Sequence, residues 1–243
     1  MLKIFALLLD FFLSLYCWTV ISIFTVIFGI FSVIVSFFSE NVSHKIAKLW
    51  GSLILKFCIV KVNLKNLKNI SVNNKTSYII TSNHQSYFDI FILLAYLNVN
   101  FRFIAKKSLF KIPFLGQSMK RLGYIPIDRE NLRSALKSAK MVVELLKNKK
   151  TSILIFPEGT RSLDGKLSSF KKGGLSMFLK QGDMILLPVV IKGSIDILKK
   201  NSLVVHPGKT VELHILEPKT SSGQNVGVLI DEIEQETRIV LES

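Results

Sequence analysis

The strongest constraint on this chain is an apolar run near its start, where no charged residue occurs from Phe11 to Phe38. About 20 apolar residues suffice to cross the hydrocarbon core of a bilayer. A cleaved signal peptide is the alternative, but its apolar region is only about 7–15 residues long and a small-residue cleavage site follows it. Neither property fits this run. The sequence therefore predicts a membrane anchor, and Gly29 leaves open whether the anchor spans the bilayer or folds back.

The stretch that follows, from His44 to Val60, places apolar residues at helical spacing among lysines that can reach lipid headgroups. We expect an amphipathic helix in the membrane interface. A chain of 243 residues has room for one α/β domain with a real core besides such an anchor. We therefore divide it into membrane-anchoring helices at residues 1–60 and a single folded domain at residues 61–243.

The charge of the chain is concentrated in that domain. The net charge is +15, and residues 61–224 contain 27 basic and 10 acidic side chains. A basic body next to a lipid-embedded segment indicates an anionic phospholipid membrane and phosphorylated substrates as partners. Nucleic acid is the rival partner, but no zinc-finger, RNA-binding or helix-turn-helix signature occurs, so we expect no nucleic-acid binding.

The same distribution predicts which side of the membrane the body faces. Lys3 is the only basic residue ahead of the apolar run, so the positive-inside rule places the body on the cytoplasmic face, at the inner membrane if the source is bacterial. The cysteines agree with a reducing compartment, because only Cys17 and Cys58 occur and both lie in apolar stretches. Neither a disulfide framework nor a cysteine-based metal site is supported.

Short β-like runs alternate with helical patterns after the anchor, which favours an α/β domain. The expected strands are Ser77–Ser82, Phe101–Ala105, Tyr124–Ile127, Thr151–Phe156, Met184–Ile191 and Thr210–Leu216. The expected helices are Tyr87–Tyr96, Leu109–Leu122, Asn131–Lys147, Gly173–Gln181 and Val226–Leu241.

A polar cluster, Thr81–Asp89, directly follows the first of these strands, and strand ends are where α/β proteins place their sites. His84 and Asp89 are five residues apart, so on one continuous helix they would point about 140° apart. We therefore expect His84 in the turn and Asp89 on the first helical turn, reaching back to one imidazole nitrogen. Such a pair can act as a general base on a substrate hydroxyl. The alternative is a histidine that caps the turn beside an aspartate favouring the helix N-terminus.

A second polar cluster, Phe156–Ser162, also follows an apolar strand. Arg161 offers a planar guanidinium suited to phosphate, and Glu158 is able to orient that arginine or to bind a polyol hydroxyl. Taken alone, the cluster reads equally well as a Pro-Glu-Gly turn with a surface arginine. Two polar clusters at strand ends predict one shared cleft.

Together these clusters closely resemble the signature blocks of the glycerolipid acyltransferase family. Asn83-His84-Gln85-Ser86 with Asp89 matches the first block, and Phe156 to Ser162 matches the third. The second and fourth blocks are Gly123 to Arg129 and Leu187-Pro188-Val189-Val190. The resemblance implies an α/β fold, an acyltransferase-like domain with a central mixed sheet flanked by helices behind an N-terminal hydrophobic helical anchor. Pro126 departs from the family pattern, in which an aromatic or aliphatic residue is common at this position.

The resemblance also implies an activity. The best-known members of this family make phosphatidate from lysophosphatidate. By analogy with them, His84 is the base and Asp89 its partner. The residues implied for substrate binding are Glu158, Gly159, Thr160, Arg161, Arg129 and Lys106, with Gly159 in a tight turn beside the site. The expected reaction is transfer of a fatty acyl group from acyl carrier protein or coenzyme A thioester to the sn-2 hydroxyl of lysophosphatidic acid, without a cofactor or a metal.

Three alternatives stay open. In the first, the acceptor is glycerol 3-phosphate, another lysolipid or an ornithine lipid. A hydrolase would be expected to show a serine in a Gly-x-Ser-x-Gly elbow, and the sequence has none. A noncatalytic protein that binds anionic lipid needs neither the His84–Asp89 pair nor the Glu158–Arg161 pair.

Overall fold

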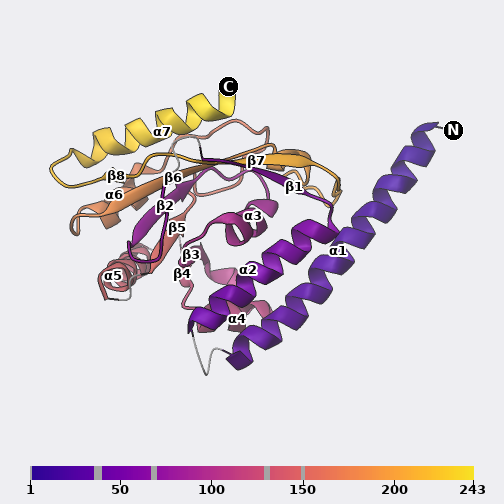
Figure 1. The fold of residues 1–243 in the computed structure, drawn as a ribbon, viewed down its shortest axis with the longest axis horizontal. Coiled ribbons are helices and arrows are strands. Elements are labelled where there is room, and N and C mark those ends of the chain that lie inside the picture. The colour runs from indigo at the N-terminus through magenta and orange to yellow at the C-terminus, as the bar shows by residue number, and fades with distance from the viewer. Residues whose placement is uncertain (1, 36–39, 67–69, 129–131, 149–150) are drawn as a thin grey trace.

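The computed structural model describes residues 2–35, 40–66, 70–128, 132–148 and 151–243 of the chain. Helices and strands alternate along most of it (Figure 1). In chain order they are α1 (Leu2–Val35), α2 (Glu40–Phe57), β1 (Lys61–Lys65), β2 (Tyr78–Ser82), α3 (Phe88–Tyr96), β3 (Phe101–Lys106), the 3-10 helix η1 (Lys107–Lys111), α4 (Leu115–Arg121), β4 (Ile125–Ile127), α5 (Leu132–Asn148), β5 (Ser152–Ile155), α6 (Lys172–Leu179), β6 (Ile185–Lys192), η2 (Ser194–Asp196), β7 (Thr210–Ile215), β8 (Lys219–Thr220) and α7 (Val226–Glu242).

The strands form one mixed sheet in the order β1-β7-β6-β2-β5-β3-β4, and the short β8 pairs with β6. Strands β6, β2, β5, β3 and β4 are parallel to one another, whereas β7 and β8 run antiparallel to β6. The carboxyl ends of the five parallel strands therefore meet at one edge of the sheet. This edge carries both polar clusters, and the expected fold class, α/β with a central mixed sheet flanked by helices, is confirmed.

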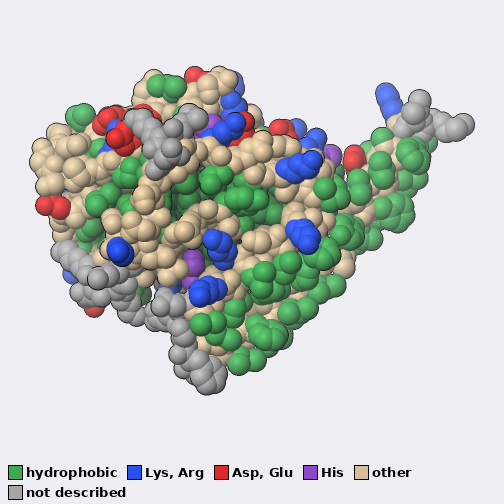
Figure 2. All heavy atoms as spheres, in the orientation of Figure 1, with side chains coloured by type: hydrophobic (Ala, Val, Ile, Leu, Met, Phe, Trp, Pro, Cys, Tyr) green, Lys and Arg blue, Asp and Glu red, His purple; other side chains and the backbone are tan. Residues whose placement is uncertain are grey.

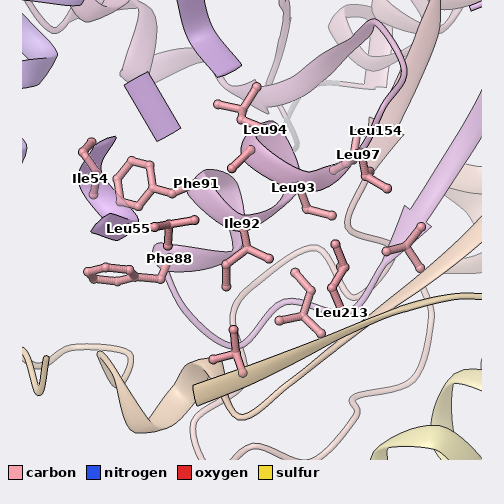
Figure 3. Packing of buried hydrophobic residues seen from close by; sticks show 14 of the residues in the cluster. Ile54, Leu55, Phe88, Phe91, Ile92, Leu93, Leu94, Leu97, Leu154 and Leu213 are labelled. Atoms are coloured by element: carbon pink, nitrogen blue, oxygen red, sulfur yellow. The ribbon is translucent and has the colours of Figure 1, made fainter. Parts of the chain in front are cut away.

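The sheet is covered on both faces, because its central strands alternate between two apolar cores. In β2, Ile80 belongs to the core with α2 and α3, whereas its neighbour Ile79 belongs to the core with α5, α6 and α7. Leu154 and Ile153 divide in the same way in β5. Helix α3 is buried on nearly all sides and sits in the middle of the first core (Figure 3). This burial fixes the position of the first turn of α3, where Asp89 lies.

Helix α1 is one continuous helix, and the N-terminal part projects beyond the rest of the molecule (Figure 1). Apolar side chains cover its visible surface (Figure 2). Its segment Lys3–Val35 is long and apolar enough to cross a membrane, with a mean hydropathy of 2.4 over its most apolar window, and only 11% of that window is buried. An apolar surface of this size on a protein marks a contact with lipid or another apolar partner.

The anchor and the domain share one core. Cys17 of α1 and Ile54 of α2 are buried in the same cluster as the apolar side chains of α3. Helix α1 also packs on α4, where a Cβ atom at Gly29 would lie 3.2 Å from the Cβ of Phe114. Gly29 therefore permits a close approach within an unbroken helix. The division at residue 60 thus marks a change in sequence character, and both sides of it contribute to one packed structure.

Three features differ from the expected elements. The single helix expected at Leu109–Leu122 is split into η1 and α4, because Pro113 disfavours the helical conformation of the residue before it and Ile112 is extended. Strands β1 and β8 were not expected, and α2 begins at Glu40, before His44. Pro126, by contrast, fits its strand, because β4 lies at the edge of the sheet that the described residues form and pairs there with β3.

Candidate active site

His84 lies in the turn between β2 and α3, and Asp89 lies in the first turn of α3. Imidazole Nδ1 of His84 is 2.8 Å from Oδ2 of Asp89. The same oxygen accepts hydrogen bonds from the backbone N–H groups of Gln85 and Ser86, at 2.8 and 2.9 Å. The spacing argument therefore gave the right geometry. Asp89 is fully buried, and its position is fixed by the turn that it closes.

The backbone of His84 is held on both sides by the second polar cluster. Its N–H donates to Oε1 of Glu158 at 2.7 Å, and its carbonyl accepts from the N–H of Ser162 at 2.8 Å. The imidazole ring stacks on Phe156, with ring centroids 3.9 Å apart and planes inclined by 13°. The two clusters thus lie against each other, as expected from their strand ends.

These contacts leave one imidazole nitrogen for chemistry. Nδ1 is occupied by Asp89, while Nε2 has no protein partner among the residues that the structure describes. The His84 side chain is 15% exposed, so one part of the ring reaches solvent. A carboxylate on Nδ1 fixes the tautomer that carries its proton there, and Nε2 is then free to accept a proton.

The carboxylate of Glu158 is not free to bind a substrate, because backbone N–H groups bind both of its oxygens. It is 2% exposed, and its second oxygen accepts from the N–H of Ser168 at 2.9 Å. Burial raises the pKa of Glu158 to about 7, although the hydrogen bonds from Ser168 and His84 act in the opposite direction. Both carboxylate oxygens therefore hold the backbone of the site, and Glu158 forms no ion pair with Arg161 among the described residues.

Arg161 and Gly159 lie on the rim of the site. The Arg161 guanidinium carbon lies 3.6 Å from the centroid of the Tyr87 ring, a cation–π contact beside the first turn of α3. Gly159 has φ of +74°, which favours glycine. A Cβ atom there would also come within 3.2 Å of the Lys171 side chain. The tight turn expected at Gly159 is present.

A cleft of about 580 Å³ lies beside this rim. Its lining residues are Lys106, Lys107, Ser108, Lys111, Ile127, Asp128 and Thr160. Lys106 and Thr160 were both expected near the substrate, and the structure brings them to one cleft. Lys107 lies 3.7 Å from Asp128, so part of the local positive charge is compensated. Arg129, the remaining expected residue, lies outside the described residues.

The connection between β6 and β7, residues 193–209, also contacts both polar clusters of the site, which the motifs did not predict. The Ser194 hydroxyl donates to Oδ1 of Asp89, and the Ser86 hydroxyl donates to the carbonyl of Leu198 at 2.9 Å. Lys200 donates from Nζ to Oγ1 of Thr160 at 3.0 Å. The available signal was that Ser194 follows the end of β6, a third parallel strand reaching the same edge.

In the described part of the chain, no group of three or more His, Cys, Asp or Glu side chains could hold a metal ion. His206 lies 3.6 Å from Asp10 and His214 lies 2.8 Å from Glu212. These histidines are therefore engaged away from His84.

A buried aspartate on histidine Nδ1, a free Nε2 and a lysine-lined cleft at the carboxyl edge of a mixed sheet define an α/β domain equipped for proton transfer from a bound substrate. Residues 61–192 match the family model described as Acyltransferase. The chain belongs to the acyltransferase family.

Relatives of known name support this assignment. A chloroplastic 1-acyl-sn-glycerol-3-phosphate acyltransferase of Arabidopsis thaliana is 38% identical over 191 residues, which are 78% of this chain and 51% of the relative. A 1-acyl-sn-glycerol-3-phosphate acyltransferase of Borreliella burgdorferi is 33% identical over 156 residues, 64% of this chain and 60% of the relative. The chain spans about half the length of the first curated relatives that it matches.

A solved structure resembles the whole chain. The crystal structure of the 1-acyl-sn-glycerophosphate acyltransferase of Thermotoga maritima superposes with a TM-score of 0.83 and 29% sequence identity. The match covers 97% of this chain and 95% of that one. The likeness therefore includes the anchor helices as well as the domain.

Proposed function

We propose that this protein transfers a fatty acyl group from an acyl thioester to the sn-2 hydroxyl of lysophosphatidic acid, giving phosphatidic acid. The observation that carries the proposal is the His84–Asp89 pair, with Nε2 of His84 free and a lysine-lined cleft at the same edge of the sheet. The names of the relatives and of the structural neighbour support lysophosphatidic acid as the acceptor. The donor is acyl carrier protein or coenzyme A thioester.

In this reaction Nε2 of His84 takes the proton of the acceptor hydroxyl as its oxygen attacks the thioester carbonyl carbon. The tetrahedral oxyanion then collapses, the carbon–sulfur bond breaks, and the leaving thiolate receives the proton back from the imidazolium. Asp89 stabilises that imidazolium through Nδ1. Acyl transfer of this kind uses no protein nucleophile. The acyl group moves from the thioester sulfur to the acceptor oxygen, and the proton moves from that oxygen through His84 to the sulfur.

We assign Lys106 and Arg161 to the acceptor phosphate, because Lys106 lines the cleft and Arg161 directly follows Thr160, which also lines it. Both side chains carry the positive charge that a phosphate needs. Glu158 receives a positioning role, since its two oxygens hold backbone N–H groups of His84 and Ser168. It thereby acts on the reaction through the orientation of His84.

The acyl chain requires an apolar environment, and a pocket between α1, α2 and α4 is lined by Phe28, Trp50, Met119 and Tyr124 among others. Aromatic rings connect it with the site, because Tyr124 contacts Phe103 and Phe103 lies beside Phe156, on which His84 stacks. The pocket has a volume of about 40 Å³, so it must widen before an acyl chain can enter it.

The exposed apolar surface of α1 supports attachment to a membrane, and the basic body supports its placement on the cytoplasmic face. Protease digestion of sealed inside-out vesicles would test that placement. Protection of the domain would contradict it.

The activity is tested by purifying the chain in neutral detergent and supplying both thioester donors with a panel of acceptors. We expect transfer to lysophosphatidate, and loss of nearly all of it in His84→Ala. The matched control is His206→Ala, because His206 is half-exposed and pairs with Asp10 instead of the site. Turnover by His84→Ala at the wild-type rate would exclude the mechanism. A clear preference for glycerol 3-phosphate or an ornithine lipid would show that the proposed acceptor is wrong, and the proposed role of His84 would still stand.

A further inference from the structure

The connection between β6 and β7 is fixed against the candidate site along most of its first half. Ser194 bonds to Asp89, the carbonyl of Leu198 bonds to Ser86, and Lys200 reaches Thr160. Asp89 and Ser86 belong to the turn that carries His84, and Thr160 lines the lysine-lined cleft. Lys200 is thus held at the border between the base and the cleft, although 40 positions separate it from Thr160.

The charge of Lys200 is not neutralised within the described part of the protein, where no carboxylate lies within ion-pair distance of its ammonium group. Other lysines differ, since Lys172 lies 2.6 Å from Asp231 and Lys219 lies 2.7 Å from Glu232. An ammonium group has three donors, and the hydroxyl of Thr160 takes one of those of Lys200. Two donors and a full positive charge therefore remain for an anionic ligand, on a side chain that is itself half-buried.

The same connection also rests on the membrane helix. The indole N–H of Trp18 donates to the carbonyl of Leu203 at 2.8 Å, and the N–H of Val205 donates to the hydroxyl of Ser14 at 2.9 Å. The Leu203 side chain is 77% exposed next to that apolar helix. An exposed leucine beside a lipid-facing helix belongs in the membrane interface. Lys200, three residues earlier, is then within reach of the headgroup layer, where lysine side chains place their charge.

We propose that Lys200 is a specificity-determining residue that binds the phosphate of the lysophospholipid acceptor as it enters from the membrane. This inference rests on the proposed function. Arg161 and Lys106 approach the phosphate from the strand ends, and Lys200 approaches it from the β6–β7 connection. The hydrogen bond to Thr160 holds the ammonium group in place before the acceptor arrives, which lowers the entropic cost of binding.

The test compares Lys200→Met with Lys199→Met, in which the neighbouring exposed lysine is replaced. Initial rates are measured at varied lysophosphatidate and then at varied thioester donor. For Lys200→Met we expect acceptor KM to rise about 10-fold, as for loss of one charge-assisted contact, with kcat and donor KM changed less than about 2-fold. Lys199→Met behaves as the wild type, and Lys200→Arg recovers most of the acceptor affinity because it keeps the charge.

A binding measurement separates this inference from the proposed function, because it needs no turnover. Fluorescent lysophosphatidate in neutral detergent micelles is titrated with each variant, and Lys200→Met is expected to have a Kd about 10-fold above that of Lys199→Met. Equal Kd values, or a rise in donor KM alone, overturn the role of Lys200. A wild-type protein that binds lysophosphatidate through Lys200 but never acylates it overturns the proposed function and leaves this inference standing.

Discussion

Replacing Glu158 with glutamine tests how the site holds its histidine. The carboxyl is buried, and its pKa is raised to about 7 from an ordinary value of 4.5. The folded protein therefore binds this proton more tightly than the unfolded chain does. Its contribution to stability is fully present below about pH 4.5 and is lost as the pH rises through 7. Between pH 5 and pH 8 the loss amounts to roughly 2–3 kcal/mol.

Glutamine removes this pH dependence but adds a constant cost. Its amide nitrogen cannot accept a hydrogen bond, so the N–H of His84 or of Ser168 loses its acceptor, at a cost of about 1–3 kcal/mol. We expect Glu158→Gln to melt below the wild type at pH 5. The difference closes or reverses by pH 8, because only the wild type loses stability at Glu158 as the pH rises.

Thermal unfolding in neutral detergent at pH 5, 6, 7 and 8 measures both effects. A change of 1 kcal/mol shifts the Tm of a protein of this size by about 2–4 °C, so the wild-type Tm should fall relative to that of Glu158→Gln by roughly 5–10 °C over this range. Glu242→Gln, at the exposed end of α7, is the control and should follow the wild type. Parallel curves for wild type and Glu158→Gln would refute the argument that burial governs this carboxyl.

Three further predictions concern other parts of the protein. Asp89→Asn should lower kcat by about 10²–10⁴-fold while acceptor KM changes little, because the amide fills the same space without the charge that stabilises the imidazolium. Steady-state kinetics measure this, and an unchanged kcat would contradict the role of the His84–Asp89 pair. Arg161→Lys should raise acceptor KM by roughly 10- to 150-fold, with donor KM nearly constant; a rise in donor KM alone would reassign Arg161. Phe12 lies on the exposed side of α1, so Phe12→Lys should weaken flotation of the protein with lipid vesicles. The acyl-transfer rate in detergent should not change. Full flotation of the variant would show that this face of α1 lies outside the lipid.

The His84–Asp89 part of the candidate site could be predicted from the sequence because its parts are local. His84 and Asp89 are five residues apart, and the strand before them was evident from its apolar run. The two clusters met because each follows a parallel strand, and parallel strands end at the same edge of a sheet. Local spacing and strand direction were together enough to place His84 beside Phe156 to Ser162.

Sequence reasoning missed what depends on distant parts of the chain. Ser194 lies 105 positions from Asp89, and no spacing rule connects them. Glu158 was expected to face the acceptor, and only the fold reveals that backbone N–H groups occupy both of its oxygens. Strand β1 is partly exposed and carries lysines at both ends, so it lacks the apolar pattern that marks the central strands. Its place is set by pairing with β7, near the other end of the chain.

The hydrogen bonds between Ser14 and Val205 have a consequence for how the protein is made. These residues are 191 positions apart, so the ribosome releases α1 long before the segment that binds it exists. An apolar helix of this length enters lipid without waiting for its partner. The body then completes its folding against a helix already in place, and β7, which follows Val205, pairs with β1 in the same late step. The membrane is therefore the first surface against which this protein assembles during its synthesis.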